Sequence, residues 1–192
     1  MIQAIKIEEA KVLSHEKYLL RKIRYAYRDK SGKSAEQVRE VYDRGDGAAI
    51  LLYNKAAGTV ILTRQFRLPT YLNGNVTGLM IEVCAGLLDR DRPEEAIRRE
   101  TEEETGYRVG PVTKVYDIYT SPGVLTEIVH CFVAEYSADM KIGEGGGLEE
   151  EQEEIEVMEV AYERALQWVR AGEIRDAKTI LLLQYMRVEG VM

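Results

Sequence analysis

The segment that begins at Pro93 and ends before Gly106 constrains the fold more than any other part of the sequence. Proline is favoured at the first position of a helix and glycine just beyond the last, so these two residues mark both ends of a predicted helix. On a helical wheel, Glu100, Glu103 and Glu104 share an arc with the aliphatic side chains that should meet the core. Carboxylates on such a face would repel one another unless a cation neutralised them.

A simpler alternative is a solvated helix held by ion pairs one turn apart, such as Glu95 with Arg99 and Arg98 with Glu102. These pairs account only for the opposite face of the helix. Magnesium takes hard oxygen ligands from a few carboxylates and keeps positions open for substrate phosphate. The core-facing carboxylates therefore indicate a magnesium site.

The rest of the chain predicts an α/β domain with a separate N-terminal part. Alternating residues from Leu20 to Tyr42 predict a hairpin of long strands, which is marginal alone and should pack on another surface, such as a second copy of the protein. We expect a hairpin subdomain over residues 1–45 and a second domain over residues 46–192. Further strands are predicted at Ala48–Tyr53, Thr59–Phe66, Leu79–Cys84, Val112–Tyr119, Ile128–Tyr136 and Ile155–Val160, followed or interrupted by helices that include Lys178–Val188.

Charge balance and cysteine count argue against several classes of function. A formal net charge of −7 disfavours non-specific binding to nucleic acid. Cys84 and Cys131 both lie in apolar stretches, so they predict core residues in a reducing compartment rather than a disulfide framework. Because no apolar segment is long enough for a secretory signal or a membrane span, we expect a soluble cytoplasmic protein with no membrane partner.

The stretch Gly86–Tyr107 resembles the Nudix box, with its Arg99-Glu100 core, its paired glutamates and its closing Gly106. The loop before the helix is one residue shorter than usual, with aspartate for the customary glutamate, and Thr101 replaces an aliphatic residue. Neither departure removes a metal-ligating carboxylate. The resemblance implies a Nudix hydrolase, which is an α/β/α sandwich around a mixed β-sheet that cleaves a nucleoside diphosphate linked to another group.

The resemblance also implies where the metal binds. Its principal ligands would be the carboxylates of Glu100 and Glu104, with the carbonyl of Ala85 as a further ligand. The implied cofactor is two or three Mg²⁺ ions, with Mn²⁺ as a possible substitute. Asp91 is expected to pair with Arg99 as a structural clamp.

A third carboxylate is expected from a mobile, acidic loop before the last predicted strand. Counting back from the strand at Ile155 selects Glu153, whereas counting forward from the preceding glycine run selects Glu151. We prefer Glu153, because the strand is the firmer reference. Glu153 is expected to act as metal ligand or general base, and Glu103 and Glu104 complete the expected catalytic set.

Matches outside the box favour one branch of the family. Ser121-Pro122-Gly123, followed by Glu127, resembles the nucleotide-sugar branch typified by ADP-ribose pyrophosphatase. Further matches at Arg39–Gly45, Arg64–Arg67 and Gly172–Lys178 look most like the bacterial GDP-mannose pyrophosphatases. This likeness implies hydrolysis of GDP-mannose to GMP and mannose 1-phosphate, with an ADP-ribose or ADP-sugar pyrophosphatase as the alternative.

Two alternatives of another class stay open: a Nudix module that binds a nucleotide without cleaving it, and an acidic interaction protein. A non-catalytic module would be expected to have lost carboxylates from the helix, and all three are present. If the chain were an acidic interaction protein, its function would not depend on magnesium.

The resemblance further implies a homodimer in which the N-terminal hairpin is exchanged, so that residues near Arg39 reach the partner's site. Arg67 and Lys178 are the cations expected on the small-molecule substrate, although each could be an ordinary surface charge. The full set of implied substrate contacts is Lys17, Val38, Arg39, Glu40, Arg67, Ala85, Gly86, Leu87, Glu104, Glu127, Gln152 and Lys178.

Overall fold

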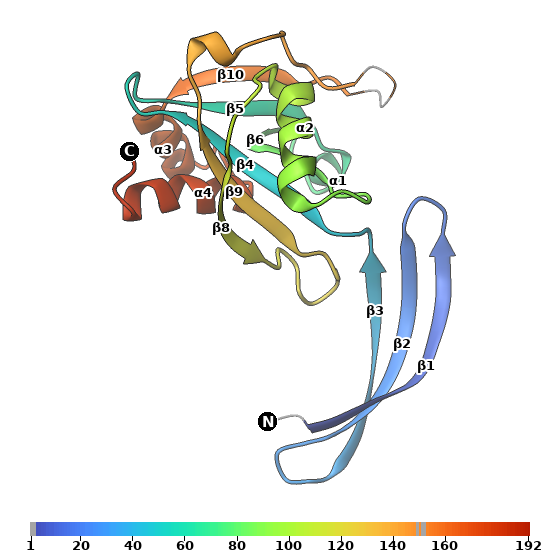
Figure 1. Ribbon diagram of the computed structural model, residues 1–192. Helices are drawn as coiled ribbons and strands as arrows, with labels where there is room; N and C mark the ends of the chain where they lie inside the picture. The colour runs from blue at the N-terminus through green and yellow to red at the C-terminus, as the bar shows by residue number, and fades with distance from the viewer. Residues whose placement is uncertain (1–2, 149, 151–152) are drawn as a thin grey trace. The chain divides into compact units, whose positions relative to one another are not determined.

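The computed structural model describes residues 3–148, 150 and 153–192, and the chain forms two compact units (Figure 1). The first unit contains Met1–Asp46 together with Tyr119–Ile128, and the second contains Gly47–Ile118 together with Val129–Met192. Within the first unit, the N–H of Tyr42 donates to the carbonyl of Val124 at 2.9 Å. The first unit is therefore built from two separate stretches of sequence.

The first unit is an antiparallel sheet whose strands follow the order β1-β2-β3. These strands are β1 (Gln3–His15), β2 (Leu19–Arg28) and β3 (Ser34–Asp43). The turn between β2 and β3 is closed by Asp29, whose carboxylate accepts hydrogen bonds from the backbone of Ser31 at 2.8 Å and of Lys33 at 3.1 Å. The predicted hairpin is confirmed as β2 and β3.

Strand β1 is a feature that the sequence pattern does not predict, and the N-terminal sheet is larger than the expected hairpin. Glu8 and Glu9 interrupt the alternation of polar and apolar residues that identifies a strand. The strand forms by pairing along β2, from Gln3 opposite Arg28 to His15 opposite Leu19. Register shifts along the ladder mark bulges, which are common on edge strands.

The second unit is built on a mixed sheet in which β4 and β9 run parallel and the other neighbours run antiparallel. The central order is β10-β5-β4-β9-β8, with β6 paired to β5 and β7 paired to β4. The strands are β4 (Gly47–Asn54), β5 (Thr59–Phe66), β6 (Leu79–Glu82), β7 (Cys84–Leu87), β8 (Thr113–Ile118), β9 (Val129–Glu135) and β10 (Glu156–Ala161).

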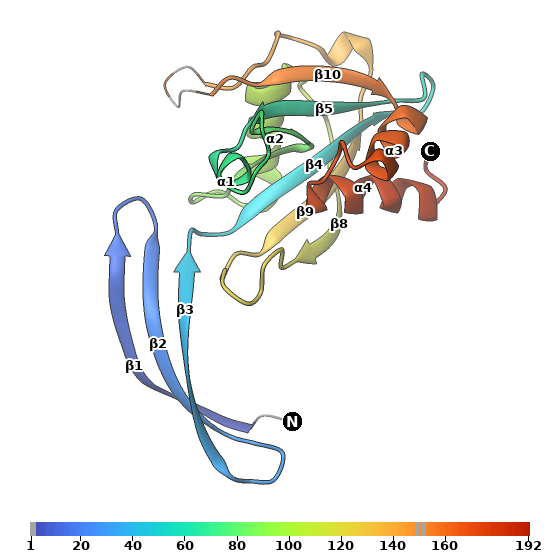
Figure 2. The same ribbon diagram turned by 180° about the vertical axis from the view of Figure 1, so that it is seen from behind.

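Helices cover both faces of this sheet, with α2 on one side and α3 and α4 on the other (Figures 1 and 2). The helical segments are α1 (Leu68–Leu72), α2 (Pro93–Thr105), η1 (Ala138–Met140), α3 (Tyr162–Ala171) and α4 (Ala177–Val188). Among the described residues, no helix has the length and apolar character needed to cross a membrane. The layers confirm the predicted α/β/α sandwich around a mixed sheet.

Strand β4 shows how one run of apolar residues supplies two cores. Successive strand residues point to opposite faces, so Ala49 and Leu51 pack with α3 and α4, whereas Ile50 and Leu52 pack on the side of α2. All four side chains are buried. A continuous apolar strand is typical of a sheet that is covered on both faces.

The helix α2 agrees with the prediction, whereas the elements before it differ from it. The helix has the predicted ends, and Gly106 closes it with a φ of 75°, a left-handed conformation that glycine adopts without steric cost. The strand predicted over Leu79–Cys84 is instead divided into β6 and β7, because the two parts pair with different neighbours. The short helix α1 was not expected from the sequence pattern, which has no periodicity over so few residues.

Candidate active site

Glu104 lies in the last turn of α2 with its side chain turned toward β7. The residue is only 3% exposed, and its Oε2 accepts a hydrogen bond from the N–H of Ala85 at 3.3 Å. Burial raises the pKa of Glu104 to about 8, and the charges of Glu100 and Glu153 act in the same direction. Among the described residues, no cationic side chain neutralises this carboxylate.

Glu100 lies one turn earlier on the same face, directly against the backbone of Gly86. A Cβ atom at Gly86 would lie 2.1 Å from the Glu100 carboxyl carbon, so only glycine leaves room for the carboxylate in this position. Burial raises the pKa of Glu100 to about 7; Arg99 opposes the increase, and the charges of Glu103 and Glu153 add to it.

Arg99 connects the helix to the loop before it. Its guanidinium lies 3.6 Å from Asp91 Oδ2, 3.0 Å from Glu100 Oε1 and 3.1 Å from Glu103 Oε2. The pairing of Arg99 with Asp91 is therefore as expected from the resemblance. Because Glu103 pairs with Arg99, it lies beside Glu100 and Glu104 without being equivalent to them.

The outer face of α2 carries ion pairs different from the predicted ones. Glu95 pairs with Arg92 at 2.6 Å rather than with Arg99, and Glu102 pairs with Arg108 at 2.7 Å rather than with Arg98. Arg99 is turned toward Asp91 and the core-facing carboxylates, which removes it from the solvated face. The alternative of a solvated helix therefore named the wrong ion-pair partners for Glu95 and Glu102.

The two departures from the box are accommodated locally. Thr101 is fully buried, and its hydroxyl donates to the carbonyl of Ile97 at 2.6 Å, which satisfies the polar group within the helix. Asp89, in the shortened loop, has a φ of 51°. Aspartate is one of the few residues other than glycine that tolerate this left-handed conformation.

The loop after η1 packs on the C-terminal end of α2. Its Gly146 and Gly147 donate backbone hydrogen bonds to the carbonyls of Glu104 at 2.9 Å and Glu103 at 3.2 Å. A Cβ at Gly145 would lie 2.4 Å from the Glu104 carbonyl oxygen, so the close approach requires glycine. The sequence predicts a mobile loop, whereas this part of it is anchored on the carboxylate-bearing helix.

Glu153 lies at the end of this loop. Its Oε2 accepts a hydrogen bond from the N–H of Leu148 at 3.3 Å, and its charge contributes to the raised pKa values of Glu100 and Glu104. The loop therefore carries this carboxylate into electrostatic range of the helix face. The alternative ligand Glu151 and the expected substrate contact Gln152 lie outside the described residues.

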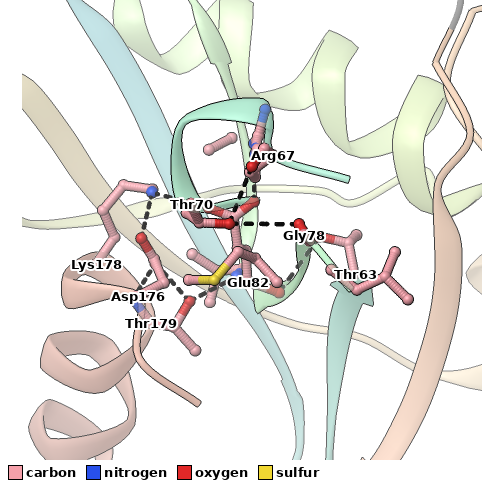
Figure 3. A network of polar contacts seen from close by, with 12 residues as sticks. Thr63, Arg67, Thr70, Gly78, Glu82, Asp176, Lys178 and Thr179 are labelled. Carbon is pink, nitrogen blue, oxygen red and sulfur yellow. Dashed lines mark hydrogen bonds and ion pairs between the residues drawn. The ribbon is translucent and has the colours of Figure 1, made fainter. Parts of the chain in front are cut away.

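Arg67 and Lys178, the two expected substrate cations, share one buried carboxylate (Figure 3). Arg67 Nε donates to Glu82 Oε2 at 2.6 Å, and Lys178 Nζ lies 3.6 Å from Glu82 Oε1. Lys178 also donates to Asp176 Oδ1 at 2.7 Å. Sequence reasoning missed Glu82, although a carboxylate inside an otherwise apolar strand is a signal that could have found it.

Several expected substrate contacts belong to the first unit. Lys17 lies in the turn after β1, and its ammonium is 5.6 Å from the centre of the Tyr18 ring. On β3, the exposed Arg39 donates to the Val38 carbonyl at 2.9 Å, and Glu40 is also exposed. Glu127, which is buried, has its Oε1 3.3 Å from Arg44 Nε. Their roles in substrate binding stay predictions.

The donors around Glu104 suit a divalent cation. Among the described residues, no three acidic, histidine or cysteine side chains form a ready-made metal cluster. Mg²⁺ usually binds through one or two carboxylates together with water and substrate phosphates, so a complete protein cage is not required. The buried, unneutralised Glu104 and the neighbouring Glu100, beside the backbone of Ala85, provide hard oxygen atoms of this kind.

Comparison with known proteins identifies the family. The NUDIX domain matches residues 43–182, and the GDP-mannose pyrophosphatase NudK N-terminal domain matches residues 4–42. The GDP-mannose pyrophosphatase of Cronobacter sakazakii is 52% identical over 188 residues, covering 98% of this chain and 97% of the relative. That of Salmonella typhimurium is 51% identical over the full length of both chains, and that of Pectobacterium atrosepticum is 52% identical over 99% of this chain and 97% of its own. The chain therefore belongs to the Nudix hydrolase family.

Proposed function

We propose that this protein hydrolyses the pyrophosphate bond of GDP-mannose in a Mg²⁺-dependent reaction that yields GMP and mannose 1-phosphate. The observation that carries the proposal is the pair of carboxylates formed by the buried Glu104 and the partly buried Glu100, beside the Ala85-Gly86 backbone. Relatives named GDP-mannose pyrophosphatase, which align along almost the whole chain, support the choice of substrate.

The residues of the site can be assigned roles in this reaction. Glu100, Glu104 and the carbonyl of Ala85 would hold Mg²⁺, with Glu153 as a further ligand or as the base. When bound, the cation supplies positive charge to the phosphate oxygens, where negative charge develops during attack. We favour two or three ions, and Mn²⁺ should substitute for Mg²⁺.

In this proposal the loop carboxylate, Glu153, acts as the general base. Water attacks phosphorus, the bond to the bridging oxygen breaks, and Glu153 accepts the proton of the attacking water on a carboxylate oxygen. Glu103, whose carboxylate pairs with Arg99, adds negative charge to the same face of the helix. Arg67 and Lys178 would bind the anionic part of the substrate and orient it, since positioning contributes much of the catalysis in phosphoryl transfer.

Replacing Glu153 by glutamine tests the assignment of the base. We expect kcat for GDP-mannose to fall by about a hundredfold or more, because a positioned general base contributes on that scale. The exposed neighbour Glu154, replaced by glutamine, is the matched control and should keep normal activity. A normal kcat for Glu153→Gln together with a large loss for Glu151→Gln would move the base to Glu151.

A panel of nucleotide sugars tests the substrate. With Mg²⁺ present, we expect the highest kcat/KM for GDP-mannose and release of GMP and mannose 1-phosphate in equal amounts, as followed by chromatography. A clear preference for ADP-ribose would overturn the substrate and keep the reaction type. Absence of any product, with nucleotide binding retained, would favour a non-catalytic binding module.

We further propose that the protein is a cytoplasmic homodimer that exchanges its N-terminal sheet, so that Lys17, Val38, Arg39 and Glu40 contribute to the partner's site. The N-terminal match to the GDP-mannose pyrophosphatase domain supports this, as do exposed apolar side chains on β1, including Ile5 at 63% exposure. Light scattering should give the mass of a dimer at micromolar concentration. A monomeric mass would remove the cross-subunit roles.

A further inference from the structure

Glu82 is a buried carboxylate that holds cations from two distant parts of the chain. It is the last residue of β6 and is 5% exposed. Arg67 comes from the junction between β5 and α1, and Lys178 comes from the first turn of α4 (Figure 3). Because burial of a lone carboxylate is costly, the two cations and Glu82 depend on one another for their positions.

Arg67 is anchored at one edge of its guanidinium. Its Nε donates to Glu82 at 2.6 Å, and its backbone is fixed by a hydrogen bond from its N–H to the Gly78 carbonyl at 2.8 Å. Within the described part of the chain, its terminal nitrogens make no hydrogen bond, and its side chain is 40% exposed. A guanidinium held in this way presents its two outer nitrogens for bidentate binding of an oxyanion.

Lys178 is fixed by two carboxylates and by the start of its helix. Its Nζ donates to Asp176 at 2.7 Å and lies 3.6 Å from Glu82. Asp176 in turn accepts from the hydroxyl of Thr179 at 2.7 Å, and that hydroxyl accepts from the N–H of Val83 at 2.8 Å. The residue that follows Glu82 is thus tied to the same helix terminus.

We propose that Glu82 is a positioning residue that aligns Arg67 and Lys178 as one pair of cations for the anionic part of the nucleotide-sugar substrate. This rests on the proposed function only in that the substrate carries a pyrophosphate. Glu82 itself does not touch the substrate. Through its contacts with both groups, Glu82 sets the direction in which the guanidinium of Arg67 and the ammonium of Lys178 point their N–H donors toward the substrate.

The test uses the full-length protein and the nucleotide sugar that the wild-type protein hydrolyses fastest. Glu82→Gln, which keeps the shape and removes the charge, should raise KM about tenfold and change kcat less than threefold, because charged hydrogen bonds contribute on this scale to binding. Calorimetry with Mg²⁺ alone should give the same affinity as the wild-type protein, since the metal ligands are elsewhere.

A double-mutant cycle separates positioning from a general structural role. In an Arg67→Gln background, adding Glu82→Gln should raise KM less than about threefold, because the effect acts largely through Arg67. The matched control is Glu156→Gln, which breaks the exposed ion pair of Glu156 with Arg64 of β5 and should leave KM unchanged. An equal loss in both backgrounds would overturn the proposal.

A second variant covers the case in which Glu82→Gln does not fold. Arg67→Lys keeps the charge on a half-exposed residue but cannot be anchored at Nε, and it should raise KM about tenfold for the same reason. Unchanged KM in Glu82→Gln, or in Arg67→Lys if the first variant is unfolded, would overturn the positioning role alone. Failure of the wild-type protein to hydrolyse any nucleotide sugar would instead overturn the proposed function, and this proposal with it.

Discussion

Glu104→Gln is expected to remove most of the hydrolytic activity and, at the same time, to make the metal-free protein more stable at pH 8. Because we propose that Glu104 holds the cation at the reacting phosphates, loss of its charge should lower kcat by at least about a hundredfold. The gain in stability follows from the pKa of Glu104, which burial raises to about 8. Above that pH the wild-type protein must bury a charge that glutamine lacks.

The sign of the pH dependence follows from proton binding. In the unfolded chain Glu104 ionises near its ordinary value of 4.5, whereas in the folded protein it keeps its proton up to about 8. Its contribution to stability is therefore fully present below about pH 4.5 and is lost as the pH rises to about 8. The loss amounts to a few kcal/mol, so Glu104→Gln should raise the Tm of the metal-free protein at pH 8 by roughly 5 °C.

Thermal unfolding in the presence of a chelator, at pH 5 and at pH 8, measures this effect. The Tm difference between variant and wild type should be small at pH 5 and large at pH 8, and added Mg²⁺ should stabilise the wild-type protein alone. Glu102→Gln is the matched control on the same helix, with normal activity and no gain in Tm at pH 8. A Tm of Glu104→Gln below that of the wild type at pH 8 would contradict the predicted burial of charge.

Gly86→Ala is expected to have the second largest effect, although it removes no chemical group from the site. The new Cβ would lie 2.1 Å from the carboxyl carbon of Glu100, so that carboxylate must turn away. The displaced group is the end of a flexible side chain, which makes the change cheap for folding. We expect kcat/KM to fall by about a hundredfold, the scale that small misplacements of catalytic groups produce, and Mg²⁺ to bind more weakly.

Gly110→Ala provides the control for the glycine substitution, because a Cβ at Gly110 meets no atom within 4 Å. Its activity, Mg²⁺ affinity and Tm should match those of the wild-type protein. Steady-state kinetics and calorimetry with Mg²⁺ distinguish the two variants. Normal Mg²⁺ affinity and activity in Gly86→Ala would show that the position of Glu100 against the Gly86 backbone is not needed for function.

The features that could be predicted from sequence are those set by neighbours along the chain. Both ends of α2 follow from residues with restricted or unusual backbone preferences, Pro93 and Gly106, and the carboxylate face follows from the helical period. The pair between Asp91 and Arg99, in contrast, was implied by the resemblance to the Nudix box. The rules for the ends and the period of a helix operate without knowledge of the rest of the fold.

The features that could not be predicted depend on partners far away in sequence. Strand β1 has a poor pattern of its own and forms on the edge that β2 provides. The loop that carries Glu153 was expected to be mobile because its composition is polar, yet its glycines reach the carbonyls at the end of α2. Composition reports the tendency of a segment alone, whereas hydrogen bonds to another element decide its order.

The helix between Pro93 and Gly106 shows where the two kinds of information meet. The sequence by itself determined that Glu100 and Glu104 share the core-facing side of a helix and call for a cation, because a period of 3.6 residues is enough to place them. Only the tertiary structure decided that Gly86 lies under Glu100, that Glu104 is buried against Ala85 and that Glu82 joins Arg67 to Lys178. Burial and long-range contacts arise when strands from separate parts of the chain pair, and no local pattern records that pairing.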